Sequence, residues 1–201
     1  MIKVGVTGGI GSGKSIVCHI FKQLDVPVFH ADSEAKKLIN TNEALKQTFR
    51  QHFGDDIYHR NGDINKAKLA SIIFQNQDEL DFVNRTVHPL VQKEFSLWAE
   101  KYSALPYVIE EAAILFESGA YHFFDKIITV TAPKTLRIQR VVERDNVKPE
   151  QVKARMDKQW NEAEKIKLSD FIVYNDEKQA VLPQVIHIDT VLNVTEVETF
   201  Y

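Results

Sequence analysis

The stretch VGVTGGIGSGKS, residues 4–15, decides the fold. From Gly8 to Ser15 it follows the pattern G-x-x-x-x-G-K-[ST], which is typical of a loop that binds phosphate groups. Apolar residues alternate before the loop and predict a β-strand, and Ser15 opens a predicted helix whose N-terminus favours an anion. Glycines let successive N–H groups converge, Lys14 adds a positive charge, and the Ser15 hydroxyl can bind Mg²⁺. The alternative is a glycine-rich turn with an unrelated lysine, but the order of strand, loop and helix favours the phosphate site.

Length and composition predict one compact domain with small insertions. The 201 residues are 44% hydrophobic, enough for a buried core, and the net charge of −3 argues against a general nucleic-acid-binding protein. No apolar run approaches the roughly 20 residues that span a bilayer, and no signal peptide is predicted before the first strand. Cys18 is the only cysteine, which excludes an internal disulfide and fits a reducing compartment. We expect a cytoplasmic protein, a monomer or weak homo-oligomer, with no nucleic-acid or membrane partner.

Strands and helices alternate along the chain. After the first strand, further strands are predicted at 26–29, 107–112, 126–131 and 171–174. Helices are predicted at 14–24, at 33–53 with a break near 40–42, at 65–102 with an interruption at His88-Pro89, from about 134, at 148–167 and at 177–186. This alternation predicts an α/β protein in which helices cover both faces of a parallel five-stranded sheet.

Carboxylates follow two of the predicted strands, at the edge where open α/β sheets bind ligands. Asp32 can accept a proton from an attacking hydroxyl or help to hold Mg²⁺, or it can cap the helix that follows. Glu110 and Glu111 fall on opposite faces of their strand, so one of them can meet a Mg²⁺-bound water, with a structural salt bridge as the alternative. Glu117 can point into the same cleft or be a surface charge.

A basic helix face is the second strong signal. Arg137, Arg140 and Arg144 are spaced to lie on one face of a helix. From Lys134 to Lys165 there are nine Lys or Arg and six Asp or Glu, a local charge of +3 in a chain whose net charge is −3. Arginines stabilise the charge that spreads over a transferred phosphoryl group, so this face favours a polyanionic ligand. The alternative is a solvated helix face.

Several motifs, taken in order, resemble the dephospho-coenzyme A kinase family. They are the loop 7–15, Ala31-Asp32, His88-Pro89, Ile114-Leu115-Phe116-Glu117, Gln139-Arg140 with Arg144-Asp145, and Arg155-Met156 with Gln159. The similarity runs from Val4 to about Asn175, nearly the whole chain. Each motif alone is weak, and their order and spacing make the resemblance specific.

The resemblance implies in-line transfer of the ATP γ-phosphoryl group to the ribose 3′-hydroxyl of dephospho-coenzyme A, the last step of CoA biosynthesis. Asp32 would be the catalytic base, with Lys14 and Arg140 as further catalytic residues. The ATP contacts it implies are Gly9, Gly11, Ser12, Gly13, Lys14, Ser15, Ile16, Arg140, Arg144 and Asn175. The acceptor contacts it implies are Asp32, His88, Leu115 and Glu117. Ser15 would hold Mg²⁺, with Glu111 as a further candidate through water.

The resemblance also implies a P-loop NTPase fold that carries a helical lid and a helical substrate-binding insertion. The chain would be a single domain, 1–201, whose core comprises 1–32, 104–134 and 168–201. The acceptor-side insertion would be 33–103 and the lid 135–167. Ile16, His30, Glu111 and Ala113 depart from the residues common in the family, and His30 leaves Asp32 as the one carboxylate after the second strand.

Two other functions fit part of the pattern. Another small-molecule P-loop kinase, for a nucleoside or nucleotide, explains the loop and the lid but leaves His88-Pro89 and Leu115-Phe116-Glu117 without a role. A non-catalytic nucleotide-binding switch would fit the loop alone. The tetrapeptide Asn-Lys-x-Asp, typical of guanine-reading switches, does not occur in the chain.

Overall fold

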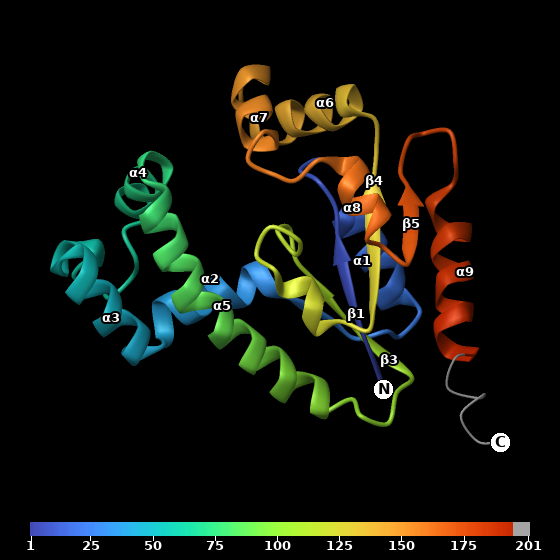
Figure 1. Ribbon diagram of the computed structural model, residues 1–201, viewed down its shortest axis with the longest axis horizontal. Helices are drawn as coiled ribbons and strands as arrows, with labels where there is room; N and C mark the ends of the chain where they lie inside the picture. Colours follow the sequence, from blue (N-terminus) through green and yellow to red (C-terminus); the bar gives the residue numbers. More distant parts are fainter. Residues whose placement is uncertain (195–201) are drawn as a thin grey trace. The chain divides into compact units, whose positions relative to one another are not determined.

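The computed structural model describes residues 1–194, so the last part of the predicted core segment 168–201 lies outside the described residues. The chain divides into two compact units (Figure 1). The first, which we call the nucleotide unit, contains Met1–His30 and the chain from Ala99 onward. The second, the helical unit, is Ala31–Trp98.

The nucleotide unit is built on a five-stranded sheet. Its strands are β1 (Ile2–Thr7), β2 (Val28–His30), β3 (Tyr107–Glu111), β4 (Lys126–Thr131) and β5 (Phe171–Tyr174). All pairs are parallel, in the order β2-β3-β1-β4-β5, which confirms the predicted fold class. Glu111 is in register with both Val6 and His30. The ends of three strands therefore meet at one edge of the sheet, where β1 leads into the glycine loop.

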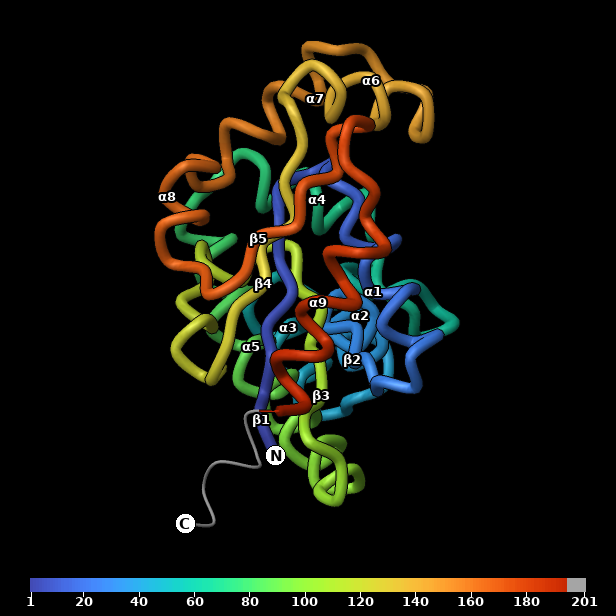
Figure 2. The backbone as a smooth tube through the Cα atoms, turned by 90° about the vertical axis from the view of Figure 1, so that its right-hand side faces the viewer, coloured from blue at the N-terminus to red at the C-terminus, as the bar shows by residue number. Residues whose placement is uncertain are grey.

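Helices cover the sheet because its central strands β1, β3 and β4 bury consecutive side chains and so have two buried faces. The helices of this unit are α1 (Lys14–Gln23), α6 (Lys134–Asp145), α7 (Pro149–Met156), α8 (Glu162–Lys167) and α9 (Val181–Val194), with a 3₁₀ turn, η2, at Ala120–Phe123. α1 and α9 lie side by side (Figure 2) and share one core cluster with the strands. On β1, Gly5 makes room for the buried Leu115. α6 and α7 lie past the carboxyl end of β4 (Figure 1).

The helical unit contains α2 (Ala31–Thr41), α3 (Glu43–Phe53), the 3₁₀ turn η1 (Asp55–Ile57), α4 (Lys66–Gln75) and most of α5 (Gln77–Glu100). The predicted break near 40–42 is confirmed, because the Asn42 side chain caps α3 by accepting from the Leu45 N–H at 3.0 Å. The predicted interruption at Pro89 is wrong, since α5 runs through it. Val87 and Val91, one turn apart, are buried on the same face of α5, and this packing outweighs the backbone bond that the exposed Pro89 removes.

Two predicted helix boundaries are also wrong. The helix expected at 148–167 is two helices, α7 and α8, separated by residues 157–161, because the Asn161 side chain accepts from the Ala163 N–H and starts a new helix. The helix expected at 177–186 begins only at Val181. Asp176 instead accepts from the N–H groups of Lys178 and Gln179, both at 3.0 Å, which holds a turn there.

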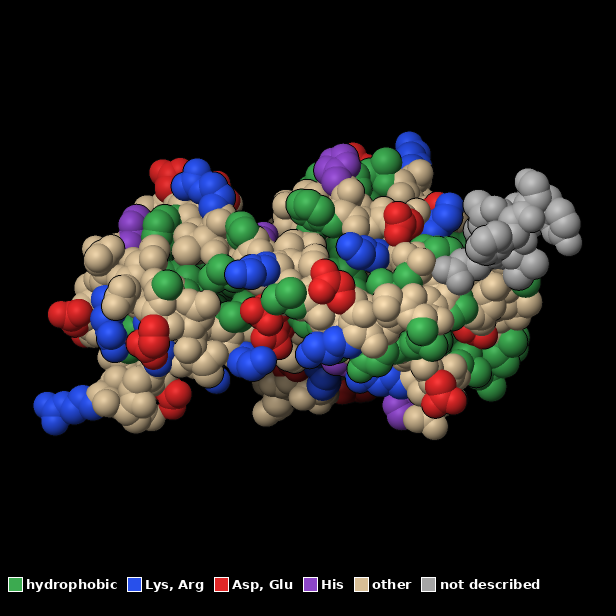
Figure 3. All heavy atoms as spheres, turned by 90° about the horizontal axis from the view of Figure 1, so that it is seen from below, with side chains coloured by type: hydrophobic (Ala, Val, Ile, Leu, Met, Phe, Trp, Pro, Cys, Tyr) green, Lys and Arg blue, Asp and Glu red, His purple; other side chains and the backbone are tan. Residues whose placement is uncertain are grey.

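The surface shows no field of one sign on the face drawn in Figure 3. Lys and Arg side chains alternate there with Asp and Glu side chains. Within residues 1–194, no helix is long and apolar enough to cross a membrane.

Candidate functional site

The glycine loop has the backbone that its sequence predicts. Gly11 and Gly13 have φ of +79° and +95°, in the left-handed region that favours glycine. Lys14 folds back over the loop, where its Nζ donates to the Gly8 carbonyl at 2.9 Å. Ser15 follows in the exposed first turn of α1, and Ile16 beside it is 53% exposed. The predicted cofactor residues from Gly9 to Ser15 thus form one continuous segment, the loop after β1 and the first turn of α1.

Two distant segments hold Ile10 at the tip of this loop. The Gln159 Oε1 accepts from the Ile10 N–H at 2.8 Å, and the Arg137 Nε donates to the Ile10 carbonyl at 3.0 Å. The Ile10 side chain packs on the apolar cluster of Val141, Val152 and Met156 in α6 and α7. The loop is therefore attached to the helices that follow β4 by its backbone and by a side chain.

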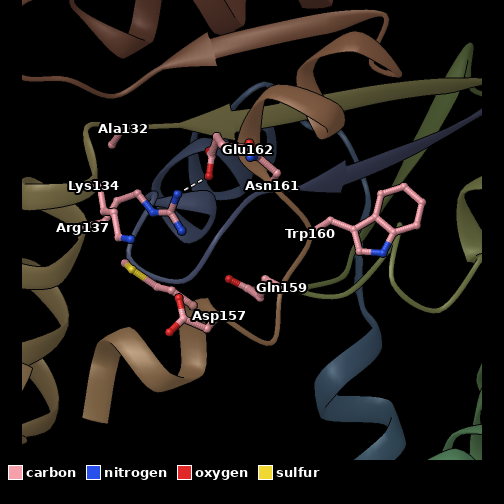
Figure 4. Close-up of a pocket in the computed structure, with 9 residues that line it drawn as sticks. Ala132, Lys134, Arg137, Asp157, Gln159, Trp160, Asn161 and Glu162 are labelled. Carbon is pink, nitrogen blue, oxygen red and sulfur yellow. Dashed lines mark hydrogen bonds and ion pairs between the residues drawn. The ribbon is translucent and has the colours of Figure 1, made fainter. Parts of the chain in front are cut away.

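Arg137 is buried between the loop and α8. Its NH1 pairs with Glu162 (Figure 4), and a side chain placed on Gly9 would collide with the guanidinium. The guanidinium borders a cavity of about 460 Å³ lined also by Lys134, Gln159, Asn161 and Glu162, among others. In Figure 4 Gln159 points toward Arg137, and the Trp160 ring lies at the far side of the cavity. The cavity beside the loop is therefore lined by two cations, Lys134 and Arg137, and by two carboxylates, Asp157 and Glu162, of which Glu162 is paired with Arg137.

Asn175, the residue after β5, joins the loop to the predicted lid helix. Its Nδ2 donates to the Ser12 carbonyl at 2.9 Å, and a Cβ on Gly13 would collide with the same amide. Arg140 donates to the Asn175 carbonyl at 3.1 Å and pairs with Glu177 at 3.2 Å. The structure therefore brings together four predicted residues, Ser12, Gly13, Arg140 and Asn175.

Glu111 and His30 meet at the same edge of the sheet. The His30 Nδ1 lies 3.0 Å from the Glu111 Oε2, and the Lys22 Nζ lies 2.7 Å from the His30 Nε2. An ammonium can only donate, so Nε2 is the acceptor and the ring hydrogen is on Nδ1, facing the carboxylate. His30 thus orients the Glu111 carboxylate, whose side chain is only 14% exposed.

Glu117 is engaged inside the nucleotide unit. Its Oε1 lies 2.6 Å from the Nζ of Lys165 and accepts from the Trp160 N–H at 2.9 Å. The Lys165 side chain is completely buried, and its Nζ makes a close ion pair without the alignment of a hydrogen bond. Leu115 is likewise fully buried in the core. The structure therefore places neither Leu115 nor Glu117 at the glycine loop.

Asp32 and His88 belong to the helical unit. Asp32 lies in the first turn of α2, two residues beyond the end of β2, and His88 lies in α5. Burial lowers the pKa of His88, and the negative charge of Asp32 opposes that shift. Of the two predicted acceptor-side residues, Asp32 therefore influences the protonation of His88 within this unit.

Arg144 and Cys18 take no part in the loop contacts. Arg144 pairs with Asp145 at 2.7 Å, and the same carboxylate accepts from Arg155 at 3.2 Å. The pKa of Asp145 is held below its usual range by the hydrogen bond from Arg144. Burial raises the pKa of Cys18 to about 12, so its thiol stays protonated and is no nucleophile.

Sequence reasoning missed two contributors to this site, Arg137 as a partner of Ile10 and Glu162 as a partner of Arg137, and it missed the buried Lys165 that pairs with Glu117. Arg137 was predicted only as part of a basic helix face, whereas its hydrogen bond to Ile10 joins residues that are 127 positions apart in the sequence. Glu162 and Lys165 were assigned no role. The helical spacing of the arginines was the one feature of the sequence that pointed to Arg137. A charged residue that is buried cannot be distinguished in the sequence from an exposed one until its partner is known.

The all-parallel sheet, the glycine loop between β1 and α1, and the arginine-bearing helix after β4 define a protein of the P-loop kinase class. A shikimate kinase from Bacteroides thetaiotaomicron shares this fold, with a TM-score of 0.50 at 10% identity over 95% of this chain and 98% of that one.

Comparison with known proteins identifies the family. The model of the dephospho-CoA kinase family matches residues 2–180. A dephospho-CoA kinase from Bacteroides fragilis is 36% identical over 187 residues, which cover 93% of this chain and 91% of the relative. Among solved structures, TT1252 from Thermus thermophilus is 30% identical, with a TM-score of 0.79 over 94% of this chain and 96% of that one. The chain therefore belongs to the dephospho-CoA kinase family.

Proposed function

We propose that this protein transfers the γ-phosphoryl group of ATP to the ribose 3′-hydroxyl of dephospho-CoA, giving CoA and ADP. The observation that carries the proposal is the formed phosphate loop, with Lys14 folded over it, Arg137 bound to the Ile10 carbonyl, and Arg140 linked to the loop through Asn175. A loop of this kind binds nucleoside phosphates, and the family to which the chain belongs supports the acceptor.

In the proposed mechanism the loop N–H groups and Lys14 hold the β- and γ-phosphates. Asp32 is the base: its carboxylate takes the proton of the 3′-hydroxyl as the hydroxyl oxygen bonds to the γ-phosphorus and the bond to ADP breaks. Arg140 supplies donors for the charge that develops on the transferred group. His88 would face the acceptor with Asp32, which is supported by the effect of the Asp32 charge on the pKa of His88 in the helical unit.

The donor atoms at the sheet edge fit a magnesium ion. Mg²⁺ prefers oxygen ligands and keeps several waters, and Ser15 offers an exposed hydroxyl while Glu111 offers an oriented carboxylate. We propose that Ser15 holds the ion and that Glu111 contacts it through water. Bound there, the ion would neutralise charge on the β- and γ-phosphates.

The test is a transfer assay with the purified protein, ATP, Mg²⁺ and separate acceptors, namely dephospho-CoA and a panel of nucleosides and nucleotides. We expect CoA and ADP to form in equal amounts with dephospho-CoA, and the Lys14→Ala variant to lose this activity. Transfer to nucleosides but not to dephospho-CoA would support the other kinase function instead. ATP consumption that no acceptor increases would support a nucleotide-binding switch.

A further inference from the structure

Ile10 is one of the points at which the phosphate loop is attached to the rest of the nucleotide unit. Its N–H is bound by Gln159, its carbonyl by Arg137, and its side chain lies among apolar residues of α6 and α7. Both polar partners come from segments more than a hundred positions away. The anion site consists of backbone N–H groups, so its shape depends on how residues 8–13 are held.

Arg137 does more in this attachment than Gln159. The Arg137 Nε donates to the Ile10 carbonyl, and its NH1 pairs with Glu162. The guanidinium also fills the space over Gly9 that a side chain at that position would need. The Arg137 side chain is 9% exposed and that of Glu162 is 23% exposed. A charged group this well buried costs free energy unless it is paired, and Glu162 supplies the pairing. Arg137 is therefore fixed in one orientation against the loop.

We propose that Arg137 is a positioning residue of the kinase reaction, which holds the phosphate loop in its anion-binding shape through the Ile10 carbonyl, and that Glu162 fixes Arg137 in that position. This inference rests on the proposed nucleotide chemistry at the loop. It goes beyond that chemistry because it states that an ion pair between α6 and α8 maintains the conformation of the loop.

The experiment measures ADP and ATP affinity by calorimetry in the wild-type protein and in Arg137→Gln, without acceptor. Because the loop holds the β-phosphate that ADP and ATP share, both dissociation constants should rise by the same factor. Loss of a charge-assisted hydrogen bond predicts a rise of roughly 10- to 100-fold. The KM for dephospho-CoA should stay within about twofold.

A second variant separates positioning from folding. Arg137→Gln leaves the Glu162 carboxylate without its partner and can destabilise the unit, whereas Arg137→Gln combined with Glu162→Gln removes both charges. The double variant should melt near the wild-type temperature and still bind ADP weakly. Lys126→Gln is the control, because it removes the cation of the Asp170 ion pair, 3.0 Å long, without touching the loop, and its ADP affinity should be unchanged.

Two outcomes would overturn the inference. Unchanged ADP affinity with a lowered melting temperature would make Arg137 purely structural. Weaker ATP binding with normal ADP binding would show a direct contact to the γ-phosphate in place of an action through the loop. Absence of transfer to dephospho-CoA in the wild-type protein would refute the proposed acceptor, while the ADP measurements would still decide the role of Arg137.

Discussion

Glu117→Gln should destabilise the protein strongly, although it changes a single atom type. Glutamine keeps the oxygen that accepts from the Trp160 N–H at 2.9 Å, so this hydrogen bond survives. The substitution removes the negative charge 2.6 Å from the Nζ of Lys165 and places an NH2 group where the second carboxylate oxygen was. The main expected effect on the free energy of unfolding is therefore the loss of the charge that pairs with the buried Lys165 ammonium.

The size of the loss follows from burial. The Lys165 side chain is 0% exposed and that of Glu117 is 13% exposed, so the unpaired ammonium cannot reach water without local opening. Removal of one partner of such a pair typically costs about 3–5 kcal/mol. In a protein of this size each kcal/mol lowers Tm by roughly 2–4 °C, which predicts a fall of roughly 10 °C. Replacement of both residues by apolar ones, Glu117→Leu with Lys165→Met, should recover most of the loss, because no charge is left buried.

The assay is urea unfolding of the wild-type protein, of Glu117→Gln and of the double variant Glu117→Leu with Lys165→Met, followed by tryptophan fluorescence. The transfer assay is run on each of the three proteins. We expect Glu117→Gln to lower the free energy of unfolding while the KM for dephospho-CoA stays near the wild-type value. A loss of less than about 1 kcal/mol in the free energy of unfolding is the effect expected for an exposed ion pair. Such a result would refute the argument that burial makes the Glu117–Lys165 pair important for stability. A raised KM with normal stability would instead support the acceptor contact predicted for Glu117 from the sequence.

Three further changes test the site. Asp32→Asn should lower kcat by roughly 10²-fold or more with ATP affinity kept, because it removes the proposed base, and near-normal turnover in a steady-state assay would make Asp32 a helix cap. Arg140→Ala should lower kcat by roughly 10²-fold and hardly move Tm, and the opposite result, a large fall in Tm with normal kcat, would reduce its bonds to Asn175 and Glu177 to a structural role. Burial lowers the pKa of His88, so the unfolded chain takes up the proton more readily and stability is lost as the pH falls below about 6.5. His88→Gln should therefore reduce the change in the urea midpoint of unfolding between pH 7.5 and pH 5. If the midpoint of the variant changes with pH as much as that of the wild-type protein, His88 is not the source of the pH dependence.

The parts of the fold that the sequence predicted are those set by local pattern. The loop between β1 and α1, the order of strands and helices, and the break at Asn42 each depend on residues that are neighbours in the chain. Pro89 shows the limit of that reasoning, because the apolar face of α5 is buried and keeps the helix intact through a residue that locally disfavours it. The helix predicted at 148–167 is divided into α7 and α8 by the Asn161 cap, and Gln159 in the break binds Ile10, a contact that no local pattern indicates.

The candidate site divides in the same way. The glycines and Lys14 were predicted with their roles because the motif holds all of them within eight residues, whereas Arg137 and Lys165 have roles that come only from distant partners. The sequence by itself determined the class of chemistry, since phosphate binding needs glycines with positive φ, a lysine and a helix start in fixed order. Only the tertiary structure decided which charges are buried and what they hold: the free energy of a buried charge depends on its partner, and folding brings that partner from far along the chain.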